Sequence, residues 1–282
     1  MIFSRCITTK TRLICSALSG IAALAAASCA SADCREQSIC VDAVNEGGEV
    51  GLHARNLRNY PITFTLSIGG GDRPQTVTRT LAPRQSEQVM RLQDANTTPS
   101  EDYRITYEWT VGDKDAVHDD DHWYSLPYAS GKSYRLLQGY GSRFSHTGLE
   151  EFAIDVDMPE GTPVHAARAG IVARIEESHS QGCWEDGCGK FANYVVVLHN
   201  DGTTGEYYHL QKNGAIVSVG DSVSQGQVIA FSGNTGHTTM PHLHFAVYRA
   251  TEWGNTQSIP VRFQSANGII SRPRRGARYE AL

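Results

Sequence analysis

Apolar and polar residues alternate with a period of two along much of this chain. Residues 62–68 read Ile-Thr-Phe-Thr-Leu-Ser-Ile, and residues 103–111 repeat the pattern with aromatic and β-branched side chains. Successive side chains of a strand point to opposite faces, so this alternation predicts half-buried β-strands. Further strands are expected at residues 49–55, 75–81 and 87–92. No helix-period segment interrupts them, which predicts an all-β module.

We place this module at residues 33–133. Several short strands at this spacing predict a small β-sandwich that resembles immunoglobulin-like domains. The module contains one group of candidate cation ligands, the run His118-Asp119-Asp120-Asp121-His122. Because no strand or turn would hold these side chains in place, we expect a solvated loop rather than a metal site.

A second domain is expected at residues 134–250, where the composition changes. Apolar runs predict strands at residues 152–156, 170–175, 193–199, 205–210 and 241–245. Asn200-Asp201-Gly202 is a hairpin turn signal, so the third and fourth of these strands should pair with each other. The whole chain is therefore predicted to be all-β.

The first 32 residues have the pattern of an export signal. Three basic residues precede the apolar run 13–27, and Ala30-Ser31-Ala32 fits a signal peptidase site. The run is shorter than the ~20 residues that a membrane span needs. Cleavage before Cys29 would instead produce a lipid-anchored protein, which we consider the weaker alternative. We expect the mature protein to be exported, to the periplasm or the extracellular space.

The charge of the mature chain argues against nucleic acid as a partner. Losing the three basic residues of the signal changes the formal net charge from −5 to about −8. Binding to nucleic acid depends mainly on neutralising phosphates, which an acidic protein does poorly.

Four of the seven cysteines lie outside the predicted signal. An even number in an exported chain indicates disulfides, and the short spacings favour Cys34–Cys40 and Cys183–Cys188. A four-cysteine zinc site usually has two Cys-x-x-Cys pairs, and neither spacing fits that pattern.

Residues 251–282 form a C-terminal extension, and its last part contains Arg272, Arg274, Arg275 and Arg278. They could bind a polyanion. We favour the alternative, a solvated and poorly ordered end of the chain.

Several histidines and one aspartate are candidates for metal chemistry. His242 and His244 share one face of the predicted strand 241–245, which would place two imidazoles around one cation. Asp155 lies on a strand and His146 on the loop before it, so they could add one oxygen and one nitrogen ligand. Asp157, in phase with Asp155, is better explained as a turn residue.

Two other histidines flank the predicted hairpin. His199 ends an apolar strand beside the turn, where a structural role is expected. His209 lies on the returning strand and is the better candidate for the site, because partners for it follow later in the chain.

Taken together, these motifs resemble the lysostaphin/LytM-type zinc metallopeptidases. The resemblance covers roughly residues 139–248 and rests on His146 with Asp155, on Tyr208-His209-Leu210, on the segment 220–236 and on Pro241-His242-Leu243-His244-Phe245. It implies a β-barrel-like fold (the duplicated hybrid motif), a single Zn2+ and cleavage of peptide bonds in peptidoglycan.

The resemblance also implies a role for each matching residue. His146, Asp155 and His244 would bind the metal, and His209 and His242 would be catalytic. The chain departs from the commonest family pattern in one place, since eight residues rather than three separate His146 from Asp155. We interpret the extra residues as an insertion in the loop.

The residue types suit the chemistry of a catalytic metal. Two neutral imidazoles and one carboxylate leave a zinc site with an open fourth position, as in catalytic rather than structural sites. Such a metal activates water without a protein nucleophile, and the chain has no Gly-x-Ser-x-Gly motif. A peptidoglycan endopeptidase is the first hypothesis; an inactive wall-binding or hydrolase-activating scaffold and a peptidase of other proteins are the alternatives. All five positions are retained, which favours an enzyme.

Overall fold

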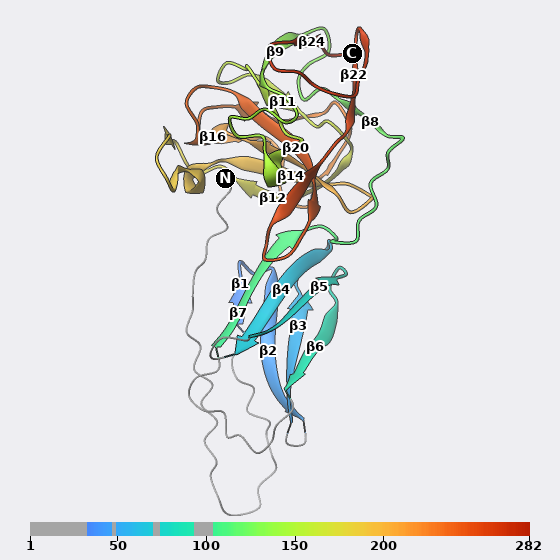
Figure 1. Cartoon of the computed structure of the whole chain (residues 1–282), viewed down its shortest axis with the longest axis vertical. Coiled ribbons are helices and arrows are strands. Elements are labelled where there is room, and N and C mark those ends of the chain that lie inside the picture. Colours follow the sequence, from blue (N-terminus) through green and yellow to red (C-terminus); the bar gives the residue numbers. More distant parts are fainter. Residues whose placement is uncertain (1–32, 47–48, 70–73, 93–103) are drawn as a thin grey trace, which may run out of the picture. The chain divides into compact units, whose positions relative to one another are not determined.

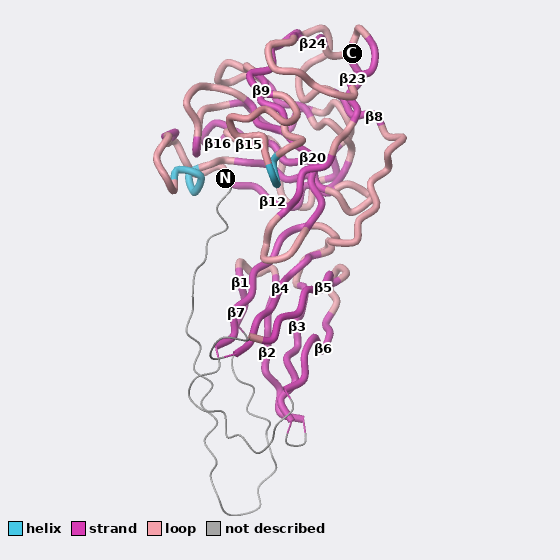
Figure 2. Tube along the Cα trace, in the orientation of Figure 1, coloured by secondary structure: helices cyan, strands magenta, loops and turns pink. Residues whose placement is uncertain are grey.

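The computed structural model describes residues 33–46, 49–69, 74–92 and 104–282. The predicted export signal and Cys29 lie outside these residues, so both stay predictions. The described residues form strands joined by loops, with two short 3-10 turns, η1 (Gly148–Glu150) and η2 (Cys188–Phe191) (Figure 2). They divide into two compact units, one of residues up to 110 with 251–255, the other of residues 111–250 with 256–282. The predicted all-β class is confirmed.

The smaller unit contains two sheets, with strand orders β1-β2-β3-β6 and β5-β4-β7 (Figure 1). The strands are β1 (Asp33–Arg35), β2 (Ile39–Glu46), β3 (Glu49–Asn56), β4 (Ile62–Gly69), β5 (Gln75–Leu81), β6 (Ser86–Leu92) and β7 (Arg104–Val111). The alternation therefore predicted β3 to β7 to within one or two residues, whereas β1 and β2 were not predicted. The likeness to immunoglobulin-like domains stays a prediction.

Strand β4 shows why a threonine-rich strand can be buried on both faces. Ile62, Phe64 and Leu66 are fully buried, as the alternation predicts. Thr63 and Thr65 on the other face are also buried, because their hydroxyls are hydrogen-bonded across to β5, at 2.9 and 3.0 Å. A buried hydroxyl costs little free energy once it has a partner.

The larger unit is built on a nine-stranded sheet of order β17-β12-β14-β15-β20-β10-β9-β24, with β21 paired to β20. Its strands are β9 (Ser133–Gln138), β10 (Ile154–Val156), β12 (Gly170–Glu176), β14 (Tyr194–Leu198), β15 (Thr204–Tyr208), β17 (Ser222–Val223), β20 (Leu243–Ala250), β21 (Thr256–Ile259) and β24 (Arg278–Glu280). Three smaller sheets contain β11 (Pro163–His165), β18 (Val228–Ser232) and β16 (Leu210–Ala215); β23 (Gly268–Ile270), β22 (Arg262–Ser265) and β8 (Trp123–Ser125); and β13 (Gly182–Cys183) with β19 (Gly236–His237). The predicted hairpin is present as β14 and β15.

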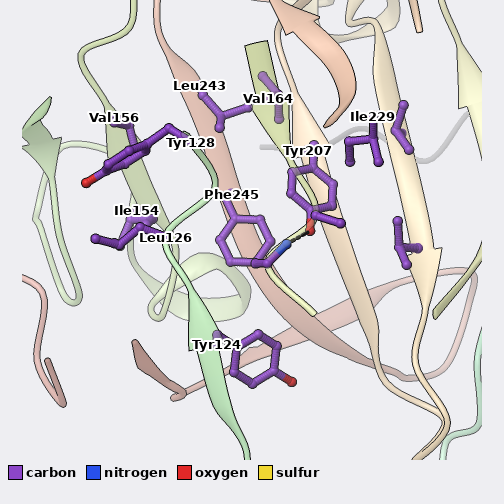
Figure 3. Close-up of a cluster of buried hydrophobic side chains, with 14 of the residues drawn as sticks. Tyr124, Leu126, Tyr128, Ile154, Val156, Val164, Tyr207, Ile229, Leu243 and Phe245 are labelled. Atoms are coloured by element: carbon purple, nitrogen blue, oxygen red, sulfur yellow. Dashed lines mark hydrogen bonds between the residues drawn. The ribbon is translucent and has the colours of Figure 1, made fainter. Parts of the chain in front are cut away.

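The central strand β20 separates two chemically different faces of this sheet. Leu243 and Phe245 point into the apolar core, where Phe245 packs against Tyr207 with ring centroids 4.9 Å apart (Figure 3). His244, between them in the sequence, points to the opposite face. Antiparallel pairing places Asp155 of β10 and Tyr208 of β15 on either side of it. Packing of Leu243 and Phe245 in the core therefore fixes β20, and with it the polar side chains on the opposite face of the sheet.

Strands from both ends of the larger unit extend beyond the limits expected for the peptidase domain. β8 pairs in parallel with β22, and β24 pairs with β9. The compact unit therefore begins at residue 111 rather than at 134, and it includes residues 256–282. The expectation of a poorly ordered C-terminal end is wrong for these residues, because their strands complete sheets and Phe263 and Ile270 are buried in the core.

Both predicted disulfides are present, Cys34–Cys40 in the smaller unit and Cys183–Cys188 in the larger. The second closes the loop between the paired strands β12 and β14. In that loop Gly182 passes so close to Asn234 that a Cβ atom would collide with its backbone oxygen, which explains the glycine. Within the described part of the chain, no helix is long and apolar enough to cross a membrane.

Candidate metal centre

Three predicted ligands come together on the polar face of the nine-stranded sheet. Asp155 lies on β10, His244 opposite it on β20, and His146 on the loop that precedes η1. One ligand atom from each lies within 4.8 Å of the others. His146 and Asp155 are thus adjacent in space although eight residues separate them in the sequence.

Asp155 is at the centre of the group. Its Oδ1 lies 3.2 Å from His146 Nε2 and 2.9 Å from His244 Nδ1. Its Oδ2 accepts a hydrogen bond of 2.6 Å from Gln138 Nε2. Burial by itself would raise the pKa of Asp155, but the hydrogen bonds and charges of His146 and His244 hold it well below the usual value. The carboxylate is therefore ionised, with one oxygen facing the two imidazoles.

The ring of His146 is oriented so that its Nε2 could bind a metal ion. The side chain is fully buried, and Nδ1 donates to the backbone oxygen of Gly139 over 3.2 Å. Nε2 is buried, and although Asp155 Oδ1 lies 3.2 Å away, the two atoms do not have the geometry of a satisfied hydrogen bond. An unsatisfied buried nitrogen costs about 1–3 kcal/mol, which a bound cation would offset. Two imidazole nitrogens and a carboxylate oxygen are a donor set that suits zinc, so these residues fit the metal.

His244 faces Asp155 with Nδ1 and has two further partners on its other nitrogen. Nε2 lies 3.1 Å from the hydroxyl of Tyr248 and 3.6 Å from Oε2 of Glu150. Burial by itself would lower the pKa of His244, but hydrogen bonds and charges from Asp155 and Glu150 raise it to about 10. Without a metal this imidazole therefore carries a proton on each nitrogen at neutral pH.

His242 and His209 stand beside the three ligands. Each donates Nδ1–H to a backbone oxygen, His242 to Met240 over 2.8 Å and His209 to Thr235 over 2.7 Å. In each ring, Nε2 is then the nitrogen that can contact water or substrate. Nε2 of His242 lies 3.8 Å from Asp155 Oδ1. The two rings are 4.5 Å apart. The prediction that His242 and His244 share one face is consistent with this geometry.

The local backbone at His209 differs from the prediction of a continuous strand. β15 ends at Tyr208, and His209 has a φ of 65°, in the left-handed region. This turn between β15 and β16 rotates the imidazole toward His242. Burial, followed by the nearby charges of His242 and His244, lowers the pKa of His209 well below its usual value. His209 is consequently neutral and able to accept a proton.

Sequence reasoning missed three residues that contact the ligands, Gln138, Glu150 and Tyr248. Gln138 reaches Asp155 because β9 pairs with β10. Tyr248 is four residues after His244 on one strand, so period two alone would have placed them on the same face. Glu150 falls inside the insertion, where no motif identifies it.

The other sequence candidates lie elsewhere. His199 is buried and hydrogen-bonded through Nδ1 to the hydroxyl of Thr203, which fits the structural role expected for it. His118 bonds to Asp120 on the loop predicted to be solvated. Asp157 pairs with Arg135 at 3.1 Å. Cys183, Glu185 and Cys188 are also close together, but the two sulfurs form a disulfide and so are not thiolate ligands.

Comparison with known proteins matches this unit to a family. Residues 150–258 match the model of Peptidase family M23. The glycyl-glycine endopeptidase ALE-1 of Staphylococcus capitis is 33% identical over 49% of this chain and 36% of its own length. The peptidoglycan DD-endopeptidase ShyA of Vibrio cholerae is 34% identical over 42% of this chain and 26% of its own length. The solved structure of lysostaphin from Staphylococcus simulans is 31% identical, with a TM-score of 0.33, and covers 44% of this chain and 47% of that one.

This chain thus spans about a third or less of the length of these two curated relatives. The matched segment contains Asp155, His209, His242 and His244, while His146 precedes it and is assigned by the geometry. From residue 150 to residue 258, this chain is thus similar to Peptidase family M23.

Proposed function

We propose that this protein is an exported zinc endopeptidase that hydrolyses peptide cross-links in peptidoglycan. The observation that carries the proposal is the His146, Asp155 and His244 group, with two more histidines directed at the same place. The relatives named as a glycyl-glycine endopeptidase and a peptidoglycan DD-endopeptidase support the substrate class. Peptidoglycan lies outside the cytoplasmic membrane, which agrees with the export signal expected at residues 1–32.

Zinc would be held by Nε2 of His146, Oδ1 of Asp155 and Nδ1 of His244. When bound there, the metal would polarise a peptide carbonyl and lower the pKa of a bound water toward ~7. Gln138 engages the second oxygen of Asp155, which leaves one oxygen for the metal. The site provides no nucleophile of its own and needs none for this reaction.

His209 and His242 would handle the proton of the attacking water and the charge on the substrate oxygen. His209 is neutral because burial lowers the pKa of its imidazole, so Nε2 is free to accept a proton. His242 lies beside it with Nε2 toward the ligands, so either imidazole can also donate to the developing oxyanion. Each contribution is worth on the order of 100-fold in rate.

The mature protein incubated with purified peptidoglycan, with and without a chelator, tests the proposal. Chelator-sensitive release of muropeptides, identified by mass spectrometry, together with one zinc per chain is the expected result. Zinc without muropeptide release would favour a peptidase of other proteins. Absence of both would favour a scaffold that binds the wall or activates another hydrolase.

A further inference from the structure

The nitrogen of His244 that points away from Asp155 is held by a second chain of hydrogen bonds. Nε2 lies 3.1 Å from the hydroxyl of Tyr248, and that hydroxyl lies 2.5 Å from Oε2 of Glu150. Tyr248 is fully buried, and the side chains of His244 and Glu150 are 13% and 14% exposed. Water therefore competes little for these bonds.

The chemistry of the three groups decides which atom donates and which atom accepts in each hydrogen bond. An ionised carboxylate only accepts, so the hydroxyl of Tyr248 donates to Glu150. The oxygen of Tyr248 is then an acceptor, and it receives Nε2–H of His244. With a proton fixed on Nε2, the neutral imidazole has its lone pair on Nδ1, the atom that faces Asp155. The chain of bonds thus selects the tautomer that can bind a metal.

Glu150 comes from the segment between the two predicted ligands His146 and Asp155. Residues 147–154 separate the two ligands, and η1 within them ends at Glu150. The segment is anchored on β21, since the amide of Phe152 donates to the hydroxyl of Ser258 over 3.0 Å. A side-chain bond from Gln257 to the backbone oxygen of Gly148 adds a second anchor. The insertion is therefore a fixed part of the site and not a free loop.

We propose that Tyr248 and Glu150 are positioning residues for His244. The proposal rests on the metal centre of the proposed function. Partners of this kind orient a ligating imidazole and make it more basic, and losing one typically lowers metal affinity 10- to 100-fold. The negative charge of Glu150, transmitted through one hydroxyl, adds to the electron density on Nδ1.

The test compares the pH-independent zinc affinity in the full chain and in two shape-conserving variants. It is obtained by competition with a chromogenic chelator at several pH values, so that competition from the proton of His244 is accounted for. Tyr248→Phe removes one hydroxyl, and we expect a 10- to 100-fold loss of affinity. Glu150→Gln keeps an acceptor for Tyr248 and removes the charge, so the loss should be smaller. Tyr128→Phe is the matched control, because it also removes a buried hydroxyl, one that donates to the backbone of Tyr279 outside the metal centre. It should bind zinc as the unaltered protein does.

A second measurement reports the position of His244 directly. In the zinc-loaded protein the Nε2–H proton of His244 should exchange slowly with solvent in nitrogen-15 NMR spectra, and it should exchange fast in Tyr248→Phe. A protein with both Tyr248→Phe and Glu150→Gln should lose less zinc affinity than the sum of the two single losses, because both substitutions break the same hydrogen-bond path.

The outcomes separate this inference from the proposed function. Folded Tyr248→Phe and Glu150→Gln proteins that bind zinc as tightly as the unaltered chain would overturn the positioning role while leaving the metal centre intact. Additive effects in the double variant would overturn the shared hydrogen-bond path. Failure of the unaltered protein to bind zinc at all would instead refute the metal centre itself, before any variant is compared.

Discussion

Zinc binding to this protein should release a proton from His244, and the amount can be worked out from the structure. In the metal-free protein the pKa of His244 is about 10, because Asp155 and Glu150 more than offset the effect of burial. At pH 7 the imidazole is therefore protonated, and its Nδ1 proton occupies the position that the metal needs. Displacing a proton from a group of pKa about 10 at pH 7 costs about 4 kcal/mol. We expect about one proton per zinc.

Isothermal titration calorimetry in buffers of different ionisation enthalpy measures this number. The same proton makes zinc affinity depend on pH: between pH 7 and pH 9 the affinity should rise about tenfold per pH unit, and the rise should level off above pH 10. Glu150→Gln removes one of the charges that raise the pKa of His244, so levelling should begin at lower pH. Zinc binding with no proton release at pH 7, or with an affinity independent of pH, would refute this account of the site.

Three other substitutions test separate parts of the molecule. His209→Ala should keep stoichiometric zinc but lose 100-fold or more in hydrolysis, measured as muropeptide release, and full activity would remove His209 from the reaction. Gln138→Leu removes the 2.6 Å hydrogen bond to Asp155 and should weaken zinc binding about tenfold, whereas unchanged affinity would show that Asp155 is positioned by its strand alone. Phe245→Ala should lower the free energy of unfolding by about 3–5 kcal/mol in urea titrations, because the side chain is 1% exposed in the core; a loss below 1 kcal/mol would contradict this packing.

Much of the fold was predictable because the local signals agree with the tertiary structure. The period-two alternation at residues 62–68 predicted β4, and Asn200-Asp201-Gly202 predicted the hairpin of β14 and β15. Residues 256–282 were misjudged for the opposite reason. Their short strands have little signal of their own, and they exist because β8, β9 and β20 offer edges for pairing.

The candidate site was likewise predictable in part. Motifs identified His146, Asp155, His209, His242 and His244, and the structure brings the first two together with His244 despite the unusual spacing. The turn at His209 was not predicted, because a left-handed residue between two strands has no sequence signal when it is not glycine.

The sequence by itself determined the longer strands, the disulfide pairs and the residue types that can bind a metal, because each depends on spacing along the chain. Only the tertiary structure decided which nitrogen of His146 and of His244 faces Asp155, and which groups hold the other nitrogen. Those choices depend on partners such as the backbone oxygen of Gly139 and the hydroxyl of Tyr248. Gln138 and Glu150 are remote from His244 in sequence and reach the site only because β9, β10 and β20 lie side by side and η1 packs against β21. Strand pairing brings such residues into contact whatever their separation along the chain.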